Sequence, residues 1–235
     1  MSKIGIIGAM DLEVDALKEK MTGVTITTRA KMEFYEGKLG SADVVVVRCG
    51  IGKVNASLCV QILADLFAVT HVINTGVAGS LNAELDIGDI LISKDVIHHD
   101  VDVRIFGYAL GEVPQLGIRA FPADARMAAL AMELCGKVNP EITVRAGRVV
   151  SGDQFISDSA VKARLIENFS GDCAEMEGAS IAQGAWLNGL PFLIIRAISD
   201  KADDSAEMDY PTFERIAAHR CAGVTMKMAK LLLGE

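Results

Sequence analysis

Short apolar strands alternate with helices along almost the whole chain, and this alternation restricts the fold more than any other feature. Residues 3–9, 44–48 and 71–75 are compact apolar runs of the kind that forms strands buried on both faces. Helical spacing of apolar residues follows the second run, from position 54 to position 67. Strands that alternate with helices predict an α/β fold, a three-layer α/β sandwich with a central mixed, largely parallel sheet.

The pattern continues along the chain without a repeat, a low-complexity tract or a linker. Residues 1–235 are therefore predicted to form a single domain, which is long enough to bury a large core. The other strands are expected at 25–28, 34–39, 90–93, 96–98, 144–150 and 192–195, and the other helices at 11–20, 125–135, 160–168, 177–187 and 212–233.

The stretch 191–203 places charged side chains at the end of a predicted buried strand. Arg196, Ser199 and Asp200 follow the apolar run 192–195 in quick succession. In open α/β sheets, ligands bind at the carboxyl ends of the strands. A buried Arg or Asp costs free energy unless it is paired with a partner, with solvent or with a ligand. The stretch favours a binding site, and an internal Arg196–Asp200 ion pair is the alternative.

Charge and hydropathy argue against several partners. The net charge is −8, from 31 acidic and 23 basic residues, which disfavours a nucleic-acid backbone or an anionic membrane surface. No stretch approaches the roughly 18 apolar residues of a membrane span. The first residues, MSKIGIIGAM, lack the features of a signal peptide. A cytoplasmic protein with no nucleic-acid or membrane partner is predicted.

No cofactor or metal is predicted. The glycine-rich turns complete neither the dinucleotide fingerprint G-x-G-x-x-G nor the P-loop motif G-x-x-x-x-G-K-[ST]. The five cysteines are scattered and form no C-x-x-C pair, so we expect reduced core thiols. His98, His99 and Asp100 superficially resemble a metal cluster, but adjacent histidines point apart on a strand.

Six motifs occur in order along the chain and together resemble one enzyme family: GIIGAMDLEV, CGIGKVNA, NTGVAGSL, VSGDQFI, AEMEGA and RAISDKAD. The combination is similar to that of the 5′-methylthioadenosine/S-adenosylhomocysteine nucleosidases, within the purine nucleoside phosphorylase-like superfamily. The resemblance covers essentially the whole chain. It implies hydrolysis of the N-glycosidic bond of these two nucleosides, with 5′-deoxyadenosine as a further substrate, in methionine salvage and S-adenosylmethionine by-product recycling.

The resemblance also implies the two catalytic residues. Asp200 would be the general acid that protonates adenine N7, and Glu13 the base that activates the attacking water. Arg196 and Ser199 would orient the water site and Asp200. The chemistry of the reaction agrees with these two roles. An N-glycosidic bond breaks most easily when adenine leaves as a neutral molecule and the attacking water loses its proton to a second carboxylate. Burial would raise the pKa of Asp200, whereas a close Arg196 would lower it.

Substrate-binding roles follow from the same resemblance. Glu177 would bind the ribose hydroxyls beside Glu175, and Met176 would pack under the sugar. Phe155 would stack on adenine, and the Ile156 backbone would recognise its Watson–Crick edge. The 5′ substituent would occupy an apolar slot in a homodimer. Its lining would be Met10, Ile51, Phe106, Tyr108 and Tyr210, with Val103 and Pro114 from the partner subunit.

Two positions depart from the family pattern. Val77 stands where many members have serine, so a hydroxyl near the water site is missing. Tyr210 stands where phenylalanine is expected, and its hydroxyl would favour a more polar 5′ group such as homocysteine. The stretch 201–210 is polar and acidic enough to be mobile, and the sequence leaves open whether it closes over the substrate as a lid.

Alternatives remain for the residues and for the function. Glu13 lies among other acids and fits a solvated helix face, Glu175 and Glu177 fit a capping pair, and Phe155 fits a core aromatic. A purine nucleoside phosphorylase, a 6-amino-6-deoxyfutalosine nucleosidase and a non-catalytic adenosine-binding protein are the competing functions. Arg48 and Arg196 support the phosphorylase, which needs cations to hold phosphate.

Overall fold

The structure is a computed structural model that describes residues 2–232, apart from the side chain of Met208. One ten-stranded sheet runs through it. Its strands are β1 (Ile4–Gly8), β2 (Thr22–Arg29), β3 (Met32–Leu39), β4 (Ala42–Arg48), β5 (His71–Ser80), β6 (Ile90–His98), β7 (Phe121–Pro122), β8 (Val144–Ser151), β9 (Cys173–Glu175) and β10 (Phe192–Asp200). The helices are α1 (Asp11–Lys18), α2 (Lys53–Phe67), α3 (Ala125–Val138), α4 (Ser159–Phe169), α5 (Gly178–Leu187) and α6 (Ala206–Leu232), with a short 3₁₀ helix at Arg104–Phe106.

The sheet is mixed, as predicted. Strands β4, β1, β5 and β10 are parallel neighbours at its centre, and β2 and β3 extend it as an antiparallel edge. On the other side, β10 pairs with β6, β6 with β8, β8 with β9, and β9 returns to the end of β5. Five strands therefore close into a ring, which brings the carboxyl ends of β5, β8, β9 and β10 together.

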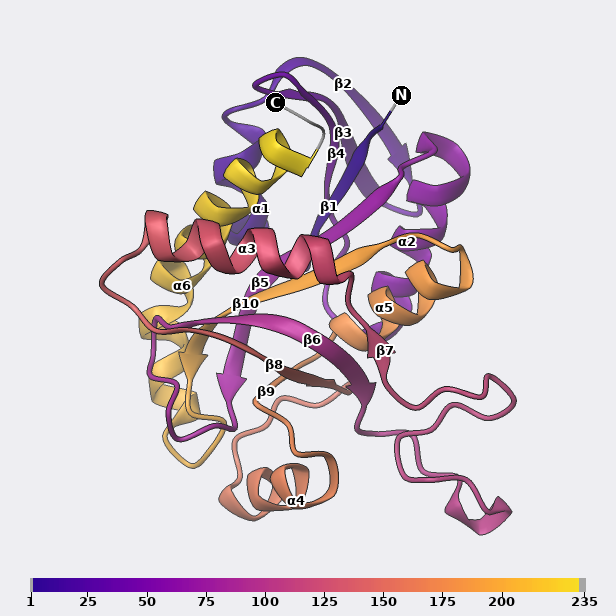
Figure 1. Cartoon of the computed structure of the whole chain (residues 1–235), viewed down its shortest axis with the longest axis vertical. Helices are drawn as coiled ribbons and strands as arrows, with labels where there is room; N and C mark the ends of the chain where they lie inside the picture. The colour runs from indigo at the N-terminus through magenta and orange to yellow at the C-terminus, as the bar shows by residue number, and fades with distance from the viewer. Residues whose placement is uncertain (1, 233–235) are drawn as a thin grey trace.

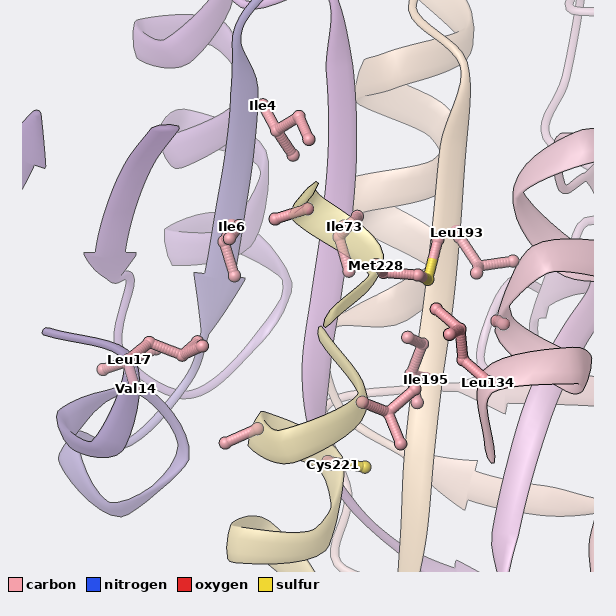
Figure 2. Close-up of a cluster of buried hydrophobic side chains, with 14 of the residues drawn as sticks. Ile4, Ile6, Val14, Leu17, Ile73, Leu134, Leu193, Ile195, Cys221 and Met228 are labelled. Atoms are coloured by element: carbon pink, nitrogen blue, oxygen red, sulfur yellow. The ribbon is translucent and has the colours of Figure 1, made fainter. Parts of the chain in front are cut away.

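Helices cover both faces of the sheet and complete the three layers (Figure 1). Side chains alternate between the faces of a strand. Ile6 therefore packs with α1, α3 and α6, whereas its neighbour Ile7 packs with α2 and α5. Figure 2 shows the first of these cores, where Met228 of α6 lies near Ile73 and Leu193 of the sheet. Burial on both faces explains why the central strands are continuous apolar runs.

Several elements differ from the sequence prediction in their bounds. Strands β5 and β10 each continue further than expected, so Arg196 and Asp200 lie on β10 rather than beyond it. Asp200 pairs with Gly79 after a register shift. The three-residue strand β9 was not predicted, because so short a segment carries no periodic pattern.

The last helix begins at Ala206 rather than at position 212. The Asp203 carboxylate accepts hydrogen bonds from the backbone and the side chain of Ser205 and fixes the turn before it. Acidic residues in the first turn of α6, Glu207 and Asp209, favour a helix N-terminus. The second half of the stretch 201–210 therefore belongs to the last helix, which was predicted to start only at 212.

Two further expectations concern the core and the surface. All five cysteines are buried with free thiols, as expected of reduced core residues. Over residues 2–232, no helix is both long enough and apolar enough to cross a membrane.

Candidate active site

A cavity of about 360 Å³ lies where the ends of β5, β9 and β10 meet the beginnings of α1 and α6. Most of the predicted site residues line it. They are Met10, Glu13, Ile51, Val77, Phe155, Glu175, Met176, Glu177, Ser199, Asp200 and Tyr210. Ile156 lines a small adjoining cavity that shares Phe155 and Asp200 with the main one. The motifs at separate strand ends therefore converge on one site.

Glu13 is buried at the first turn of α1, with only 4% of its surface exposed. One carboxylate oxygen accepts hydrogen bonds from the backbone amides of Ala9 at 2.6 Å and Met10 at 3.1 Å. The other accepts from the amide of Val77 at 3.1 Å. Burial raises the pKa of Glu13, and the nearby Arg196 and the amides oppose this rise. The alternative of a solvated helix-face acid is wrong.

Asp200 is also buried, at the end of β10. The Ser199 hydroxyl donates to one carboxylate oxygen at 2.8 Å, and the Ala202 amide donates to the other at 2.8 Å. Burial raises the pKa of Asp200 against these two hydrogen bonds, and the charges of Asp209 and Asp203 add to the rise. A carboxyl group in this setting keeps its proton to higher pH than a solvated aspartate.

Arg196 pairs with a different carboxylate from the one that the sequence suggested. Its guanidinium contacts Glu175 and the Asn74 side chain, and lies 4.0 Å from a carboxylate oxygen of Glu177. Burial acts to lower the pKa of Arg196, but the charge of Glu175 and then those of Glu13 and Glu177 raise it above its usual value. The Arg196–Asp200 ion pair does not form. Arg196 is therefore not a partner of Asp200, and burial is the main influence on the pKa of Asp200, which it raises.

Glu175 and Glu177 differ in their surroundings. Glu175 accepts hydrogen bonds from the Ser151 hydroxyl and from the Gly178 amide at 2.8 Å, at the first turn of α5. Glu175 therefore satisfies one amide at the start of α5, but Glu177, the N-cap residue, makes no side-chain capping hydrogen bond, so the two do not form the capping pair. Glu177 instead accepts from the amide of Gly52 at 2.8 Å. Burial beside the charge of Glu175 raises the pKa of Glu177 to about 8.

Two glycines of β5 allow the carboxylates to approach the strand. A β-carbon at Gly76 would lie 2.5 Å from the Glu13 carboxylate, and one at Gly79 would lie 2.6 Å from the Asp200 carboxylate. Both distances are below any real contact of a β-carbon. The run Asn74–Gly79 thus has a direct role in the site, since its glycines leave room for two acids.

This close approach gives a prediction for Gly76→Ala. The added methyl group displaces the Glu13 carboxylate, and a misplacement of about 1 Å can cost about a hundredfold in rate. We expect a loss of about that size in kcat/KM, measured by steady-state kinetics. Gly136→Ala is the matched control, because a β-carbon there meets no atom within 4 Å. Equal activity of the two variants would contradict this placement of Glu13.

Aromatic residues form the outer part of the cavity. Phe155 is 50% exposed, which excludes the core-aromatic alternative. Its ring meets the edge of Tyr210 at a centroid distance of 5.6 Å and an angle of 77°. The Tyr210 hydroxyl donates to the sulfur of Met10 at 3.3 Å, so it links two predicted slot residues. An exposed face of Phe155 remains available for stacking.

Four predicted slot residues lie elsewhere in this chain. Val103, Phe106, Tyr108 and Pro114 belong to the segment between β6 and β7, which projects away from the sheet (Figure 1). None of them lines the cavity within the described residues. Phe106 is 77% exposed.

Sequence reasoning missed three groups that hold the site together. The Gly52 amide binds Glu177, the Ser151 hydroxyl binds Glu175, and the Asn74 side chain binds Arg196. All three lie in motifs quoted in the sequence analysis, Gly52 in CGIGKVNA, Asn74 in NTGVAGSL and Ser151 in VSGDQFI. The sequence motifs indicate where the strands end, but they do not show which side chain each of these groups binds.

Comparisons with known proteins identify the family of this chain. Residues 3–230 match the model of the phosphorylase superfamily. A 5′-methylthioadenosine/S-adenosylhomocysteine nucleosidase of Exiguobacterium sp. is 41% identical over 231 residues, which cover 98% of each chain. The chain belongs to the phosphorylase superfamily and, within it, to the family of 5′-methylthioadenosine/S-adenosylhomocysteine nucleosidases.

Solved structures with the same fold include two kinds of enzyme. The nucleosidase of Colwellia psychrerythraea, in complex with adenine, has a TM-score of 0.94 at 38% identity, covering 97% of this chain and 95% of its own. A futalosine hydrolase of Helicobacter pylori has a TM-score of 0.92 at 32% identity, covering 97% of both chains.

Proposed function

We propose that this protein hydrolyses the N-glycosidic bond of 5′-methylthioadenosine and S-adenosylhomocysteine, releasing adenine and the 5′-substituted ribose. One observation carries the proposal: two buried carboxyl groups, Glu13 and Asp200, line one cavity, and burial raises the pKa of both. They approach β5 at Gly76 and Gly79, which are about 10 Å apart along a strand. This spacing leaves room for a sugar and a water between an acid and a base.

Each carboxyl group has the properties that its role requires. Asp200 keeps a proton to raised pH and would donate it to adenine N7, which makes adenine a neutral leaving group. Glu13 is held by three backbone amides and would take the proton of the attacking water. Glu177 would bind the ribose hydroxyls, and Phe155 would stack on the purine.

Charge at the cavity favours water over phosphate as the nucleophile. Of the described residues that line the cavity, none is lysine or arginine. Arg196 is already paired with Glu175, and Arg48 pairs with Asp11. Glu13 repels an anion at the same place. The two arginines that supported a phosphorylase are therefore engaged elsewhere.

A futalosine-type nucleoside is the second candidate substrate. The similarity to the Helicobacter pylori futalosine hydrolase supports it, and the Tyr210 hydroxyl adds a polar group beside the slot for the 5′ substituent. A non-catalytic adenosine-binding protein is disfavoured, because a pure binder does not need a buried acid and a buried base.

We also propose that the chain acts as a single-domain, cytoplasmic homodimer. The free thiols of the five cysteines suit a reducing compartment. Ile105 and Phe106 are 88% and 77% exposed on the projecting segment, and exposed apolar residues mark interaction surfaces. A second copy would cover them and bring Val103 and Pro114 to its partner's cavity.

Adenine release in phosphate-free buffer tests the substrate. We expect rapid release of adenine from methylthioadenosine and from S-adenosylhomocysteine. The release is measured by ultraviolet absorbance or chromatography. Release that is faster from 6-amino-6-deoxyfutalosine would favour the second candidate. Tight binding of adenosine without any release of adenine would indicate a non-catalytic adenosine-binding protein.

A further inference from the structure

Three charged residues outside the cavity form hydrogen bonds with one another next to the turn that carries the Gly52 amide. Lys53 begins α2, Asp100 follows β6, and Asp153 follows β8. None of the three lines the main cavity. We propose that this Lys53–Asp100–Asp153 ring consists of positioning residues, which hold the Gly52 amide in place for Glu177. The inference rests on the proposed function, because it assigns the ring an effect on the same ribose-binding carboxylate.

The turn before α2 is fixed in part by two hydrogen bonds. The Asn55 side chain donates to the Ile51 carbonyl at 2.7 Å, and the Gly50 amide donates to the Ala9 carbonyl at 3.1 Å. Gly50 and Gly52 adopt φ values of 88° and 97°, in the region that favours glycine. Gly52 is the N-cap of α2 and has no side chain to cap the helix. Its amide is nevertheless aimed at the Glu177 carboxylate at 2.8 Å. Neither of those two hydrogen bonds involves the amide of Gly52 or of Lys53, whose partners Glu177 and Asp153 come from other parts of the chain.

Asp153 supplies the missing cap from a distant part of the chain. Its carboxylate accepts a hydrogen bond from the amide of Lys53, the first residue of α2, at 2.8 Å. An N-cap side chain usually comes from the residue before the helix, and here it comes from 100 residues away. A β-carbon at Gly52 would lie 3.0 Å from this carboxylate, so glycine allows the approach.

Asp100 closes the ring. The Lys53 ammonium pairs with one of its carboxylate oxygens at 2.6 Å, and the Asp153 amide donates to the other at 3.2 Å. The Lys53 and Asp100 side chains are only 20% and 22% exposed. Burial acts to raise the pKa of Asp100, but the hydrogen bonds from Lys53 and the Asp153 amide lower it below its usual value. Asp100 is therefore ionised at neutral pH and accepts hydrogen bonds from both neighbours in the ring.

The ring also joins two walls of the cavity. Ile51 lies next to Gly52, and Phe155 lies two residues after Asp153, and both line the cavity. Loss of the ring frees the turn that binds Glu177 and loosens the segment that carries Phe155. Both effects fall on substrate binding more than on the acid and base.

Asp153→Ala and Asp153→Asn form the decisive pair. Alanine removes the cap, whereas asparagine keeps an oxygen for the Lys53 amide and is an equally good capping residue. We expect kcat/KM for methylthioadenosine to fall about tenfold in Asp153→Ala, mainly through KM, and to stay within about twofold in Asp153→Asn. Because the Gly52 hydrogen bond lowers the pKa of Glu177, the acid limb of the kcat/KM profile should move to higher pH in Asp153→Ala only.

Two further variants separate a local effect from a general one. Lys53→Met breaks the second link of the ring and should reproduce the rise in KM. Asp43→Asn removes a comparable ion pair, Lys38–Asp43 at 2.8 Å, which lies on β3 and β4 and outside the cavity. It should leave kcat/KM unchanged. Unchanged kinetics in both Asp153→Ala and Lys53→Met would overturn the proposal.

Hydrogen exchange of the substrate-free protein gives a readout that does not depend on activity. Faster exchange over residues 49–54 in Asp153→Ala, but not in Asp153→Asn or Asp43→Asn, supports the bracing role. Equal exchange in all three variants overturns it. If the unmodified protein releases no adenine, the proposed function fails, and this exchange result still decides the role of the ring.

Discussion

Asp200→Asn is expected to lower kcat/KM for methylthioadenosine by about 10²–10⁴-fold, the usual contribution of a general acid. Asparagine has almost the same shape, and its oxygen can still accept from the Ala202 amide. Its NH2 group takes the place of the oxygen that accepts from Ser199, and the Ser199 hydroxyl can turn to accept from it. What is lost is the proton that the carboxyl group carries. Steady-state kinetics measures the loss, and Asp204→Asn, an exposed change in the same segment, should have little effect.

The pH profile makes this prediction more specific. Asp200 is active when protonated, and burial raises its pKa, so the unmodified protein should lose activity as the pH rises through that raised pKa. Asparagine does not titrate, so this alkaline limb should disappear from the residual activity of the variant. A variant with an unchanged alkaline limb, or with activity within about twofold of the parent, would remove Asp200 from the acid role.

Glu13→Gln is expected to have an effect of similar size, about 10²–10⁴-fold in kcat/KM, because the base is lost. It should also destabilise the fold. Both oxygens of Glu13 accept backbone amides, and glutamine replaces one of them with a donor. One buried amide then lacks an acceptor, which costs about 1–3 kcal/mol of the free energy of unfolding.

Chemical denaturation and kinetics separate these two consequences. Glu19→Gln, an exposed change just after α1, controls for the loss of a charge. The dissociation constant of adenine should change little in Glu13→Gln, because the proposed adenine contacts lie at Phe155 and Asp200. A large loss of adenine binding would mean that Glu13 supports the whole cavity rather than the water.

Much of the fold follows from local patterns. The continuous apolar runs at β1, β4 and β5 predict strands buried on both faces, and the structure confirms the mixed α/β sheet. The strand ends could be marked from the sequence because glycines and charged residues interrupt the apolar runs there. Gly76 and Gly79 are the clearest case, since each leaves room for a carboxylate from another element.

The pairing of charges could not be predicted in the same way. Arg196 and Asp200 are close in sequence, but Arg196 pairs with Glu175, which comes from the short strand β9. That choice depends on the closed ring of strands, which no local pattern encodes. The start of α6 was missed for a related reason, because the polar residues of its first turn resemble those of a loop.

The identity of the sugar product tests the central claim most directly. Methylthioadenosine would be incubated with the protein in phosphate buffer, and the products analysed by mass spectrometry. Hydrolysis predicts free 5-methylthioribose and adenine even when phosphate is abundant, because the Glu13 carboxylate that acts as the base repels the anion and Arg196 is paired with Glu175. Formation of 5-methylthioribose 1-phosphate would contradict the account, since phosphate would then be the nucleophile and Glu13 would not be the base.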